Sequence, residues 1–394
     1  MSTVCQLFKL YNMNIIRSCK CYFSKWLTKK KKAEIKEIIT ECNKIQNYFV
    51  NSYENNIPEL SKYNLTSATV IQKCIKDTET FLTARLIKQV FWNTYGIISA
   101  AKERANKQQE EYKTPKLPKS TVTLSECSSE FSLSKLKLFD SVLTLKSIRT
   151  DKKRGYKINI PIKKNKVFNK WNEIGALNKS VILCEDKVIF SFDITVENKK
   201  MAGELIGVDF GIKHLGTLSN GLTFGDKIEE HILQLENKKK YSKGYYRKKK
   251  EIRDYINKEI KKIDFQNTQL IVIEKLSKFK YKMKNKKKFS KKVRKVLNNL
   301  STWQFYKRIK SLSEENRVCF RAVPAYNTSI MCSKCGHIEK GNRKTQEHFT
   351  CQKCGYTDNA DLNASKNILN RFLTGMYGSR FKQVIEPWEL GLIL

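Results

Sequence analysis

The spacing of apolar residues predicts helices near the start of the chain. After a strand-like run over residues 15–26, apolar side chains recur at helical spacing from Ile35 to Phe49, which predicts an amphipathic helix with a basic start at residues 29–32. A second helical stretch is predicted from about residue 67 to residue 105. The first part of the chain is therefore expected to be one strand followed by helices.

From about residue 119 to residue 196 the period of the apolar positions changes to two. Alternating apolar residues cover 156–162 and 188–196, and a turn at residues 185–187 precedes the second run. This pattern predicts a small antiparallel barrel or sheet. If the first strand belongs to it, the preceding helices interrupt this sheet in the sequence.

Two later apolar runs each end in an acidic residue. Residues 205–208 lead to Asp209, and the chain continues through a second short run to a turn at residues 219–221, so a hairpin is expected. Residues 270–273 form another buried-strand pattern that ends at Glu274. A charged group at the end of such a strand is costly unless it is paired or binds a metal.

A third acid, Asp361, follows Asn359-Ala360 at the predicted entrance of a helix. Each acid alone is better explained as a partner in an ion pair. The three together favour a shared site, because carboxylates that converge repel one another and a divalent cation relieves the repulsion. Oxygen ligands suit Mg²⁺ or Mn²⁺, and two such ions can promote phosphodiester hydrolysis.

Four cysteines have the spacing of a structural zinc site. Cys332 and Cys335 form one C-x₂-C knuckle, fifteen residues follow, and Cys351 and Cys354 form the second. A glycine directly after each knuckle permits the tight turns that direct two sulfurs to one ion. Four thiolates close the coordination sphere, so the zinc is expected to be structural and to brace the strand around Val323 and the helix of Asp361.

The net charge of +39 indicates a polyanionic partner, since 77 Lys and Arg face only 38 acidic residues. An anionic membrane is the alternative, but no apolar run approaches the roughly 18–20 residues that cross a bilayer, and the N-terminus lacks the apolar core of a signal peptide. Nucleic acid is therefore favoured.

Eight further cysteines are scattered, which favours a reducing, intracellular location, here the nucleoid-associated cytoplasm. Cys19 and Cys21 are either a metal pair or two strand residues that point the same way.

Candidate nucleic-acid contacts lie in basic segments that also carry aromatic residues. Residues 238–262, which include Arg247, and residues 278–294, which include Lys280 and Lys282, combine cations with rings on which bases can stack. A solvated basic helix is the alternative for the first segment, and a mobile flap beside Glu274 is favoured for the second. In the zinc region, Arg343 and Lys344 are candidate phosphate contacts, with a solvated loop as the alternative for Arg343.

The order, type and spacing of several motifs resemble the TnpB family of transposon-encoded RNA-guided nucleases, which is related to type V CRISPR effectors and to Fanzor proteins. The resemblance covers about residues 204–370 and is carried by residues 207–211, 273–276, Trp303, 324–335, Arg343, 349–351 and 359–368. It implies a RuvC-like, RNase-H-fold active site in which Asp209, Glu274 and Asp361 are catalytic and bind Mg²⁺ or Mn²⁺.

The resemblance also implies a domain plan and an activity. The N-terminal half matches only in architecture, as a wedge-type β-barrel split by a helical recognition domain, and Met13 is a candidate functional start. The implied domains are wedge strands 1–28, helical domain 29–118, wedge remainder 119–200, RuvC-like domain 201–325 with a basic helical insertion 226–268, zinc ribbon 326–356, RuvC-like remainder 357–372 and tail 373–394.

The implied function is cleavage of both strands of duplex DNA, directed by a guide RNA and a short target motif. The partners would be guide RNA and double-stranded DNA, and the cofactors a catalytic Mg²⁺ and a structural Zn²⁺. Two other classes stay open: an RNA-guided DNA-binding protein, and a transposase accessory without nuclease activity.

Overall fold

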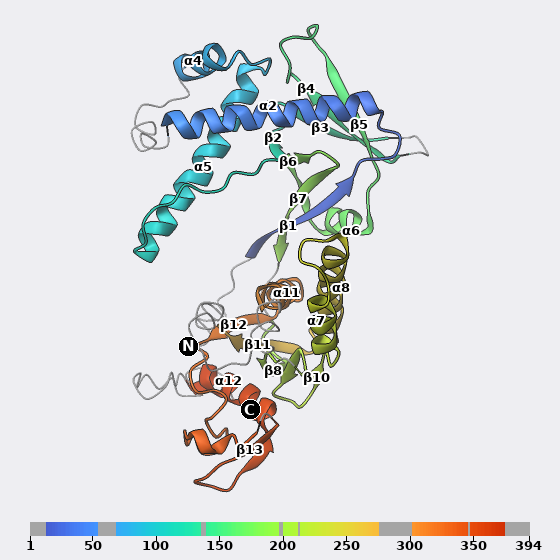
Figure 1. The fold of residues 1–394 in the computed structure, drawn as a ribbon. Helices are drawn as coiled ribbons and strands as arrows, with labels where there is room; N and C mark the ends of the chain where they lie inside the picture. The colour runs from blue at the N-terminus through green and yellow to red at the C-terminus, as the bar shows by residue number, and fades with distance from the viewer. Residues whose placement is uncertain are drawn as a thin grey trace. The chain divides into compact units, whose positions relative to one another are not determined.

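The computed structural model describes residues 13–53, 68–134, 139–196, 200–211, 213–275, 302–345 and 347–374. They form two compact units, an N-terminal unit of residues 14–195 and a C-terminal unit that begins at residue 196 (Figure 1). Each unit combines helices with β-sheets, so the prediction of a multidomain α/β fold is confirmed at this level. Within the described ranges, no helix combines the length and the apolar character that crossing a membrane requires.

Helix α2 (Lys29–Tyr53) in the N-terminal unit follows the predicted pattern, and Ile35, Ile38 and Ile45 are fully buried. The second helical stretch, predicted as one, is two helices, α4 (Ala68–Thr78) and α5 (Ala84–Gln108). That prediction was wrong because the chain turns at Glu79, which has a left-handed φ of 49°, and Leu82 then pairs with Arg149.

The strands of the N-terminal unit form two antiparallel sheets. One has the order β1-β7-β6-β2 and the other β3-β4-β5, and Phe23 bridges to Ile162 of the second sheet. The first strand thus belongs to the same sheet as β7, although α2, α4, α5 and the other strands of the unit lie between them in sequence. The strands are β1 (Met13–Tyr22), β2 (Thr121–Leu124), β3 (Ser129–Leu133), β4 (Ser141–Lys146), β5 (Lys157–Ile162), β6 (Ala176–Cys184) and β7 (Lys187–Val196).

Two details of this unit bear on the sequence predictions. A short helix, α6 (Lys166–Ile174), interrupts the strand region and was not predicted; the Asn165 side chain caps its start, and Phe168 and Trp171 bury its apolar side. Cys19 and Cys21 are both buried in β1 with their sulfurs 4.0 Å apart, so they do point to the same side of the strand.

The C-terminal unit is built on a five-stranded sheet of order β10-β9-β8-β11-β12. Strands β8, β11 and β12 are parallel, while β9 and β10 form the antiparallel hairpin predicted after Asp209. These strands are β8 (Glu204–Asp209), β9 (Gly216–Leu218), β10 (Thr223–Phe224), β11 (Thr268–Glu274) and β12 (Cys319–Val323).

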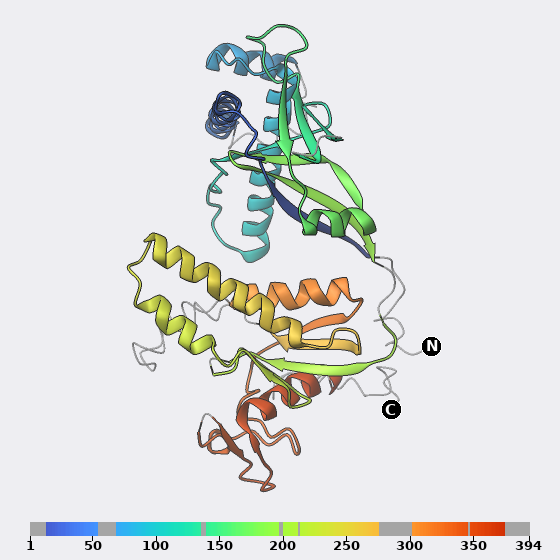
Figure 2. The same ribbon diagram turned by 90° about the vertical axis from the view of Figure 1, so that its right-hand side faces the viewer.

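Helices cover both faces of this sheet (Figure 2). Ile206, Val208, Ile271 and Ile273 point into a core shared with α7 (Ile228–Glu236), α8 (Lys243–Glu259) and α11 (Thr302–Glu315). The alternate positions on β11 and β12 pack instead against Ile368 of α12 (Ala360–Thr374). Because side chains alternate along a strand, Asp209 and Glu274 lie on the α12 face.

Helix α12 lies very close to β8. A Cβ atom placed on Gly207 would lie 2.1 Å from the carbonyl oxygen of Ser365 and 2.9 Å from Leu369 Cβ. Only glycine at this position therefore permits the backbone of α12 to rest on the strand, and this contact brings the start of α12 toward the ends of β8 and β11.

Candidate metal sites

The register of the parallel strands brings the first two acids together. Val208 on β8 pairs with Ile273 on β11, so the next residues, Asp209 and Glu274, lie at the adjacent carboxyl ends of the two strands. Both side chains face α12. This edge of a parallel sheet is where α/β proteins commonly bind ligands.

The third acid comes from the first turn of α12. The Asn359 side chain accepts hydrogen bonds from the backbone N–H groups of Asp361 (2.9 Å) and Leu362 (3.2 Å), which makes it the N-cap. Gly211 lies close to the Asp361 carboxylate, because a Cβ atom placed there would lie 3.8 Å from Asp361 Oδ2, and it would lie 2.8 Å from the carbonyl oxygen of His214. The chain after β8 and the start of α12 thus approach each other at the acids.

The environment of Asp209 includes both of the other acids. Burial raises the pKa of Asp209 well above its usual range, and the negative charges of Glu274 and Asp361 raise it further, while Arg343 lowers it. Burial also raises the pKa of Glu274, against a hydrogen bond from Thr328 and the charge of Arg371. A divalent cation between these oxygens would favour their ionised forms, so the donor set fits Mg²⁺ or Mn²⁺.

Two further side chains contact the acids. Arg343 Nη2 donates to Asp361 Oδ1 at 2.9 Å and is only partly exposed, so it is not the solvated loop residue considered from sequence. Thr328 donates its hydroxyl to Glu274. No sequence pattern predicted a functional role for Thr328. Arg343 was predicted as a phosphate contact because it is basic.

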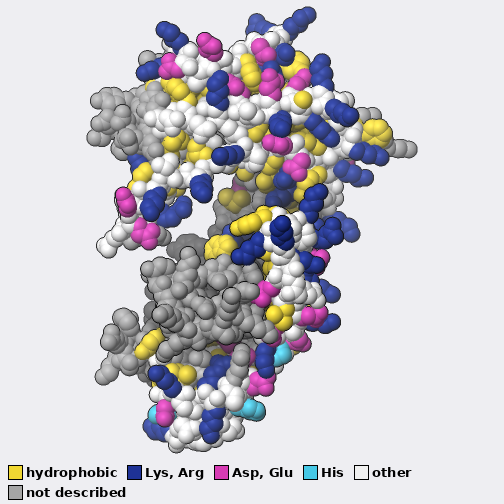
Figure 3. All heavy atoms as spheres, in the orientation of Figure 1, with side chains coloured by type: hydrophobic (Ala, Val, Ile, Leu, Met, Phe, Trp, Pro, Cys, Tyr) yellow, Lys and Arg dark blue, Asp and Glu magenta, His cyan; other side chains and the backbone are white. Residues whose placement is uncertain are grey.

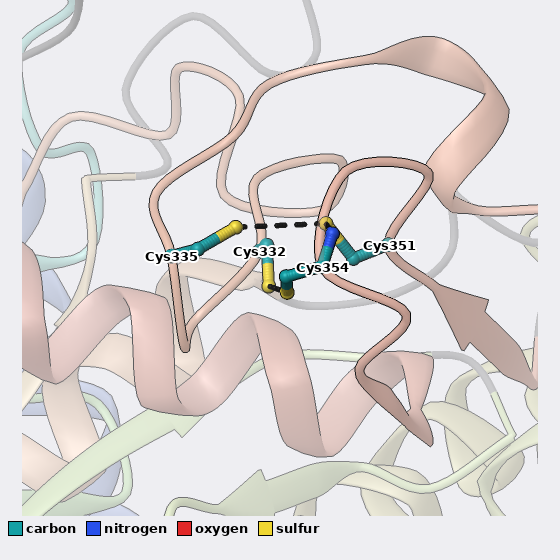
Figure 4. A group of neighbouring side chains, drawn as sticks. All are labelled: Cys332, Cys335, Cys351 and Cys354. Carbon is teal, nitrogen blue, oxygen red and sulfur yellow. Dashed lines mark hydrogen bonds between the residues drawn. The ribbon is translucent and has the colours of Figure 1, made fainter.

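The four cysteines converge as predicted (Figure 4). The sulfurs of Cys332 and Cys354 are 3.7 Å apart and those of Cys335 and Cys351 are 3.6 Å apart. Tetrahedral zinc with Zn–S bonds of about 2.3 Å places its sulfurs about 3.8 Å from one another. The geometry therefore fits a single zinc ion.

The two knuckles repeat one backbone pattern. Each glycine after a knuckle donates its N–H to the carbonyl of the first cysteine of its pair, and Gly336 and Gly355 have φ values of 71° and 69°. A short helix η2 (Lys340–Asn342) and strands β13 (His348–Thr350) and β14 (Thr357–Asn359) complete the zinc region.

Buried asparagines, which sequence reasoning missed, attach the knuckles to their surroundings. Asn363 of α12 accepts from the Ser333 N–H (3.0 Å) and donates to the Met331 carbonyl (2.8 Å), and Asn367, one turn later, donates to the same carbonyl (2.6 Å). Their i, i+4 spacing on an otherwise apolar helix face was the available signal. Asn342 links the two knuckles, because it donates to the Ile330 and His337 carbonyls and accepts from the Gln352 N–H.

The remaining predicted residues are more scattered. Lys344 is exposed in the zinc region and Arg247 is exposed on α8. Lys280, Lys282 and the rest of residues 278–294 lie outside the described residues. Among the described residues, the four cysteines are the one group of three or more His, Cys, Asp or Glu side chains whose ligand atoms all lie within 4.8 Å of one another. The three carboxylates are spaced more widely than this.

Several known proteins are similar in sequence to this chain. Residues 303–368 match the Cas12f1-like TNB domain. The putative RNA-guided DNA endonuclease InsQ of Escherichia coli K12 is 32% identical over 43% of this chain and 49% of its own length. The TnpB-like protein aq_aa05 of Aquifex aeolicus is 32% identical over 30% of this chain and 38% of its own length. The CRISPR-associated DNA-binding protein Cas12m of Thermanaerosceptrum fracticalcis is 42% identical over 17% of this chain and 11% of its own length.

Solved structures show a similar fold at low sequence identity. A Cas12f1–sgRNA–target DNA complex matches 91% of this chain and 99% of its own with a TM-score of 0.56 and 13% identity. The mini-RNA-guided endonuclease CRISPR-Cas_phi3 matches 93% of both chains with a TM-score of 0.58 and 12% identity. The chain spans about half or less of the length of the curated relatives above. The resemblance seen in the sequence is confirmed: this chain is related to the TnpB-like proteins and has the fold of the compact Cas12f and CasΦ effectors.

Proposed function

We propose that this protein is an RNA-guided DNA endonuclease that recognises a short motif on duplex DNA and cuts both strands in one RuvC-like site. The observation that carries the proposal is the adjacency of Asp209 and Glu274 at the carboxyl ends of two paired strands, with Asp361 of α12 near enough to raise the pKa of Asp209. The relatives named as RNA-guided endonucleases support the same activity.

In this proposal the three carboxylates hold Mg²⁺ or Mn²⁺. When bound, the metal would activate a water molecule and stabilise the leaving 3′ oxygen. Thr328 orients the Glu274 carboxylate through its hydrogen bond. Arg343 holds the Asp361 carboxylate in position through its hydrogen bond, and its planar guanidinium is of the kind that binds phosphate oxygens.

We assign the other parts of the chain by the same resemblance. The two sheets of the N-terminal unit would be the wedge-type β-barrel, split by recognition helices α2, α4 and α5, with boundaries near residues 28, 118 and 200. Residues 326–356 would be a zinc ribbon inserted in the RuvC-like domain, held by a structural Zn²⁺ and facing target DNA with Lys344. No cysteine in the described ranges forms a disulfide, which fits a reducing, intracellular site of action.

The guide RNA would supply sequence specificity, while the protein grips phosphates and the shape of the heteroduplex. A net charge of +39 fits that role, because charge attracts the backbone without reading bases. Duplex DNA would then be cut only when it matches the guide and carries the motif.

The test starts from the RNA that copurifies with the protein, which is sequenced and resynthesised. Wild-type protein with this RNA should cut a matching plasmid in Mg²⁺, and Asp209→Asn or Asp361→Asn should reduce cutting by at least about 1000-fold while RNA-dependent DNA binding persists. Asp254→Asn, at an exposed acid on α8, is the matched control and should cut normally. Equal cutting by RNA-free protein on any duplex would refute RNA guidance.

The second candidate function is RNA-guided DNA binding without cleavage. Its support is the relative named a DNA-binding protein, Cas12m, which is 42% identical over 17% of this chain. RNA-dependent DNA binding by the wild type, with no cutting in either Mg²⁺ or Mn²⁺, would favour this function and exclude the nuclease.

A further inference from the structure

The tip of the α7–α8 hairpin has an unusual composition. Between residues 238 and 250 the chain carries eight lysines and arginines, three tyrosines and no acidic residue. The whole segment lies within the described residues and contains the connection between the two helices and the first turns of α8. Figure 2 shows this connection at the end of the hairpin away from the sheet.

The loop has a defined conformation. Ser242 caps α8 by accepting a hydrogen bond from the Tyr245 N–H at 3.1 Å, and the Ser242 N–H donates to the Lys239 carbonyl at 3.2 Å. Tyr241, between them, has a left-handed φ of 66°. Residues other than glycine seldom adopt this backbone region, and strained residues of this kind cluster at functional sites.

The three tyrosines form a row of contacting rings. Tyr245 packs against the core of the unit, and its ring lies 6.4 Å from that of Tyr241 and 5.8 Å from that of Tyr246. The two outer tyrosines are 78% and 57% exposed, so they contribute little to the core. Tyr245 thus supports two ring faces that are open to solvent.

Cations surround these rings. Lys249 lies over the Tyr245 ring at 5.1 Å. Lys248 is buried and engaged with His231 and Glu251. The other cations are all exposed, and among the described residues no carboxylate pairs with any of them; they are Lys238, Lys239, Lys240, Lys243, Arg247, Lys249 and Lys250. Figure 3 shows Lys and Arg side chains gathered over α8.

We propose that this tip is a binding site for an unpaired stretch of nucleic acid, with bases stacked on Tyr241 and Tyr246 and phosphates held by the surrounding cations. Exposed rings beside unpaired cations are what a flexible single strand requires, whereas a double helix hides its base faces. This deepens the proposed function, on which it rests, by naming where a guide or displaced strand is held. An unpaired RNA segment and a DNA strand share the required chemistry.

The first measurement locates the contact. Single strands of about 12 nucleotides that carry 5-iodouracil, one of RNA and one of DNA, are photocrosslinked to the full-length protein without divalent metal, and the crosslinked peptides are identified by mass spectrometry. We expect crosslinks at Tyr241 or Tyr246. Crosslinking by the RNA probe alone assigns the site to RNA, and by the DNA probe alone to DNA. Crosslinks elsewhere but none within residues 238–250 would overturn the proposal.

The second measurement separates stacking from charge. Tyr241→Asn with Tyr246→Ala should weaken binding of the preferred probe about 10-fold or more, yet leave unchanged the binding of an abasic strand of equal length and charge. Asn tolerates the left-handed backbone, so the loop is kept. Phe at both positions should retain wild-type binding, because stacking needs the ring and not the hydroxyl. Tyr22→Ala is the control, since Tyr22 is 60% exposed beside Lys187 but lies outside the hairpin.

Lys239→Gln with Lys249→Gln should weaken the iodouracil and abasic probes alike and reduce the log–log salt slope by about 0.7 per lost contact. If the tyrosine double variant binds every probe as the wild type does, the stacking site is refuted. These readouts need no cleavage. If guided cutting fails, these binding measurements can therefore still succeed. If the binding measurements fail in a protein that cuts, the binding site at the hairpin tip is refuted and the proposed function is not.

Discussion

Replacing Gly207 by alanine tests how closely α12 lies on the sheet. The added methyl carbon would lie 2.1 Å from the Ser365 carbonyl oxygen and 2.9 Å from both the backbone nitrogen and the Cβ of Leu369. Since ordinary carbon contacts lie near 3.5–4.0 Å, the helix must move by roughly 1 Å. Overpacking of this kind costs about 1–3 kcal/mol, and the upper part of the range is expected because the obstacle is backbone.

The predicted effect is measurable in two ways. With a slope of about 2 kcal/mol per molar urea, the unfolding midpoint of the C-terminal unit should fall by about 0.5–1.5 M, as followed by circular dichroism. Because α12 carries Asp361, a displacement of about 1 Å should also lower guided cutting by about 100-fold.

Gly244→Ala is the matched control for the unfolding measurement in the same unit. The nearest atoms would lie 3.8 Å and 3.9 Å from the new methyl group. Because Gly244 lies in the first turn of α8, the higher helix propensity of alanine should stabilise the helix by up to about 1 kcal/mol. If Gly207→Ala unfolds at the wild-type urea concentration and cuts at the wild-type rate, the close approach of α12 to β8 is wrong.

Three further substitutions test the zinc region and the acids. Cys351→Ser should abolish zinc retention, measured by elemental analysis, and greatly lower solubility, because a structural zinc is worth on the order of 10 kcal/mol; Cys127→Ser should keep the zinc, and zinc-free wild type would contradict the site. Asn363→Ala leaves the Ser333 N–H of the first knuckle unsatisfied and removes one of the two hydrogen bonds to the Met331 carbonyl, so zinc should pass to a chelator faster, and stability should fall by about 1–3 kcal/mol. Thr328→Val removes a hydrogen bond that lowers the pKa of Glu274, so half-maximal cutting should need several-fold more Mg²⁺; an unchanged requirement would show that Thr328 does not tune the acid.

Sequence patterns predicted the parts of this protein that depend on local periodicity. Apolar runs predicted the strands that end at Asp209 and Glu274, and the structure has both strands. The C-x₂-C spacing predicted that the four cysteines come together, and they do. Helix α6 had a readable signal in its Asn165 cap, but it is short and lies among strands. The break at Glu79 carried no glycine or proline to mark it.

The contacts that sequence reasoning missed are non-local. Thr328 meets Glu274, and Asn363 meets Ser333, only after the sheet has formed and α12 has packed on it. A side chain that binds the backbone of a distant loop leaves no period in its own neighbourhood. Such partners follow from tertiary packing and not from propensity.

The order of β8, β11 and α12 along the chain also bears on when the protein becomes able to cut. The three carboxylates come from elements that leave the ribosome early, midway and late in the synthesis of the C-terminal unit, so at about 5–20 residues per second the first waits on the order of ten seconds for the last. Until α12 packs on Gly207, a nascent chain lacks one of the three carboxylates. A chain with the proposed activity would therefore acquire its complete set of acids only after most of the sheet of the C-terminal unit had been synthesised.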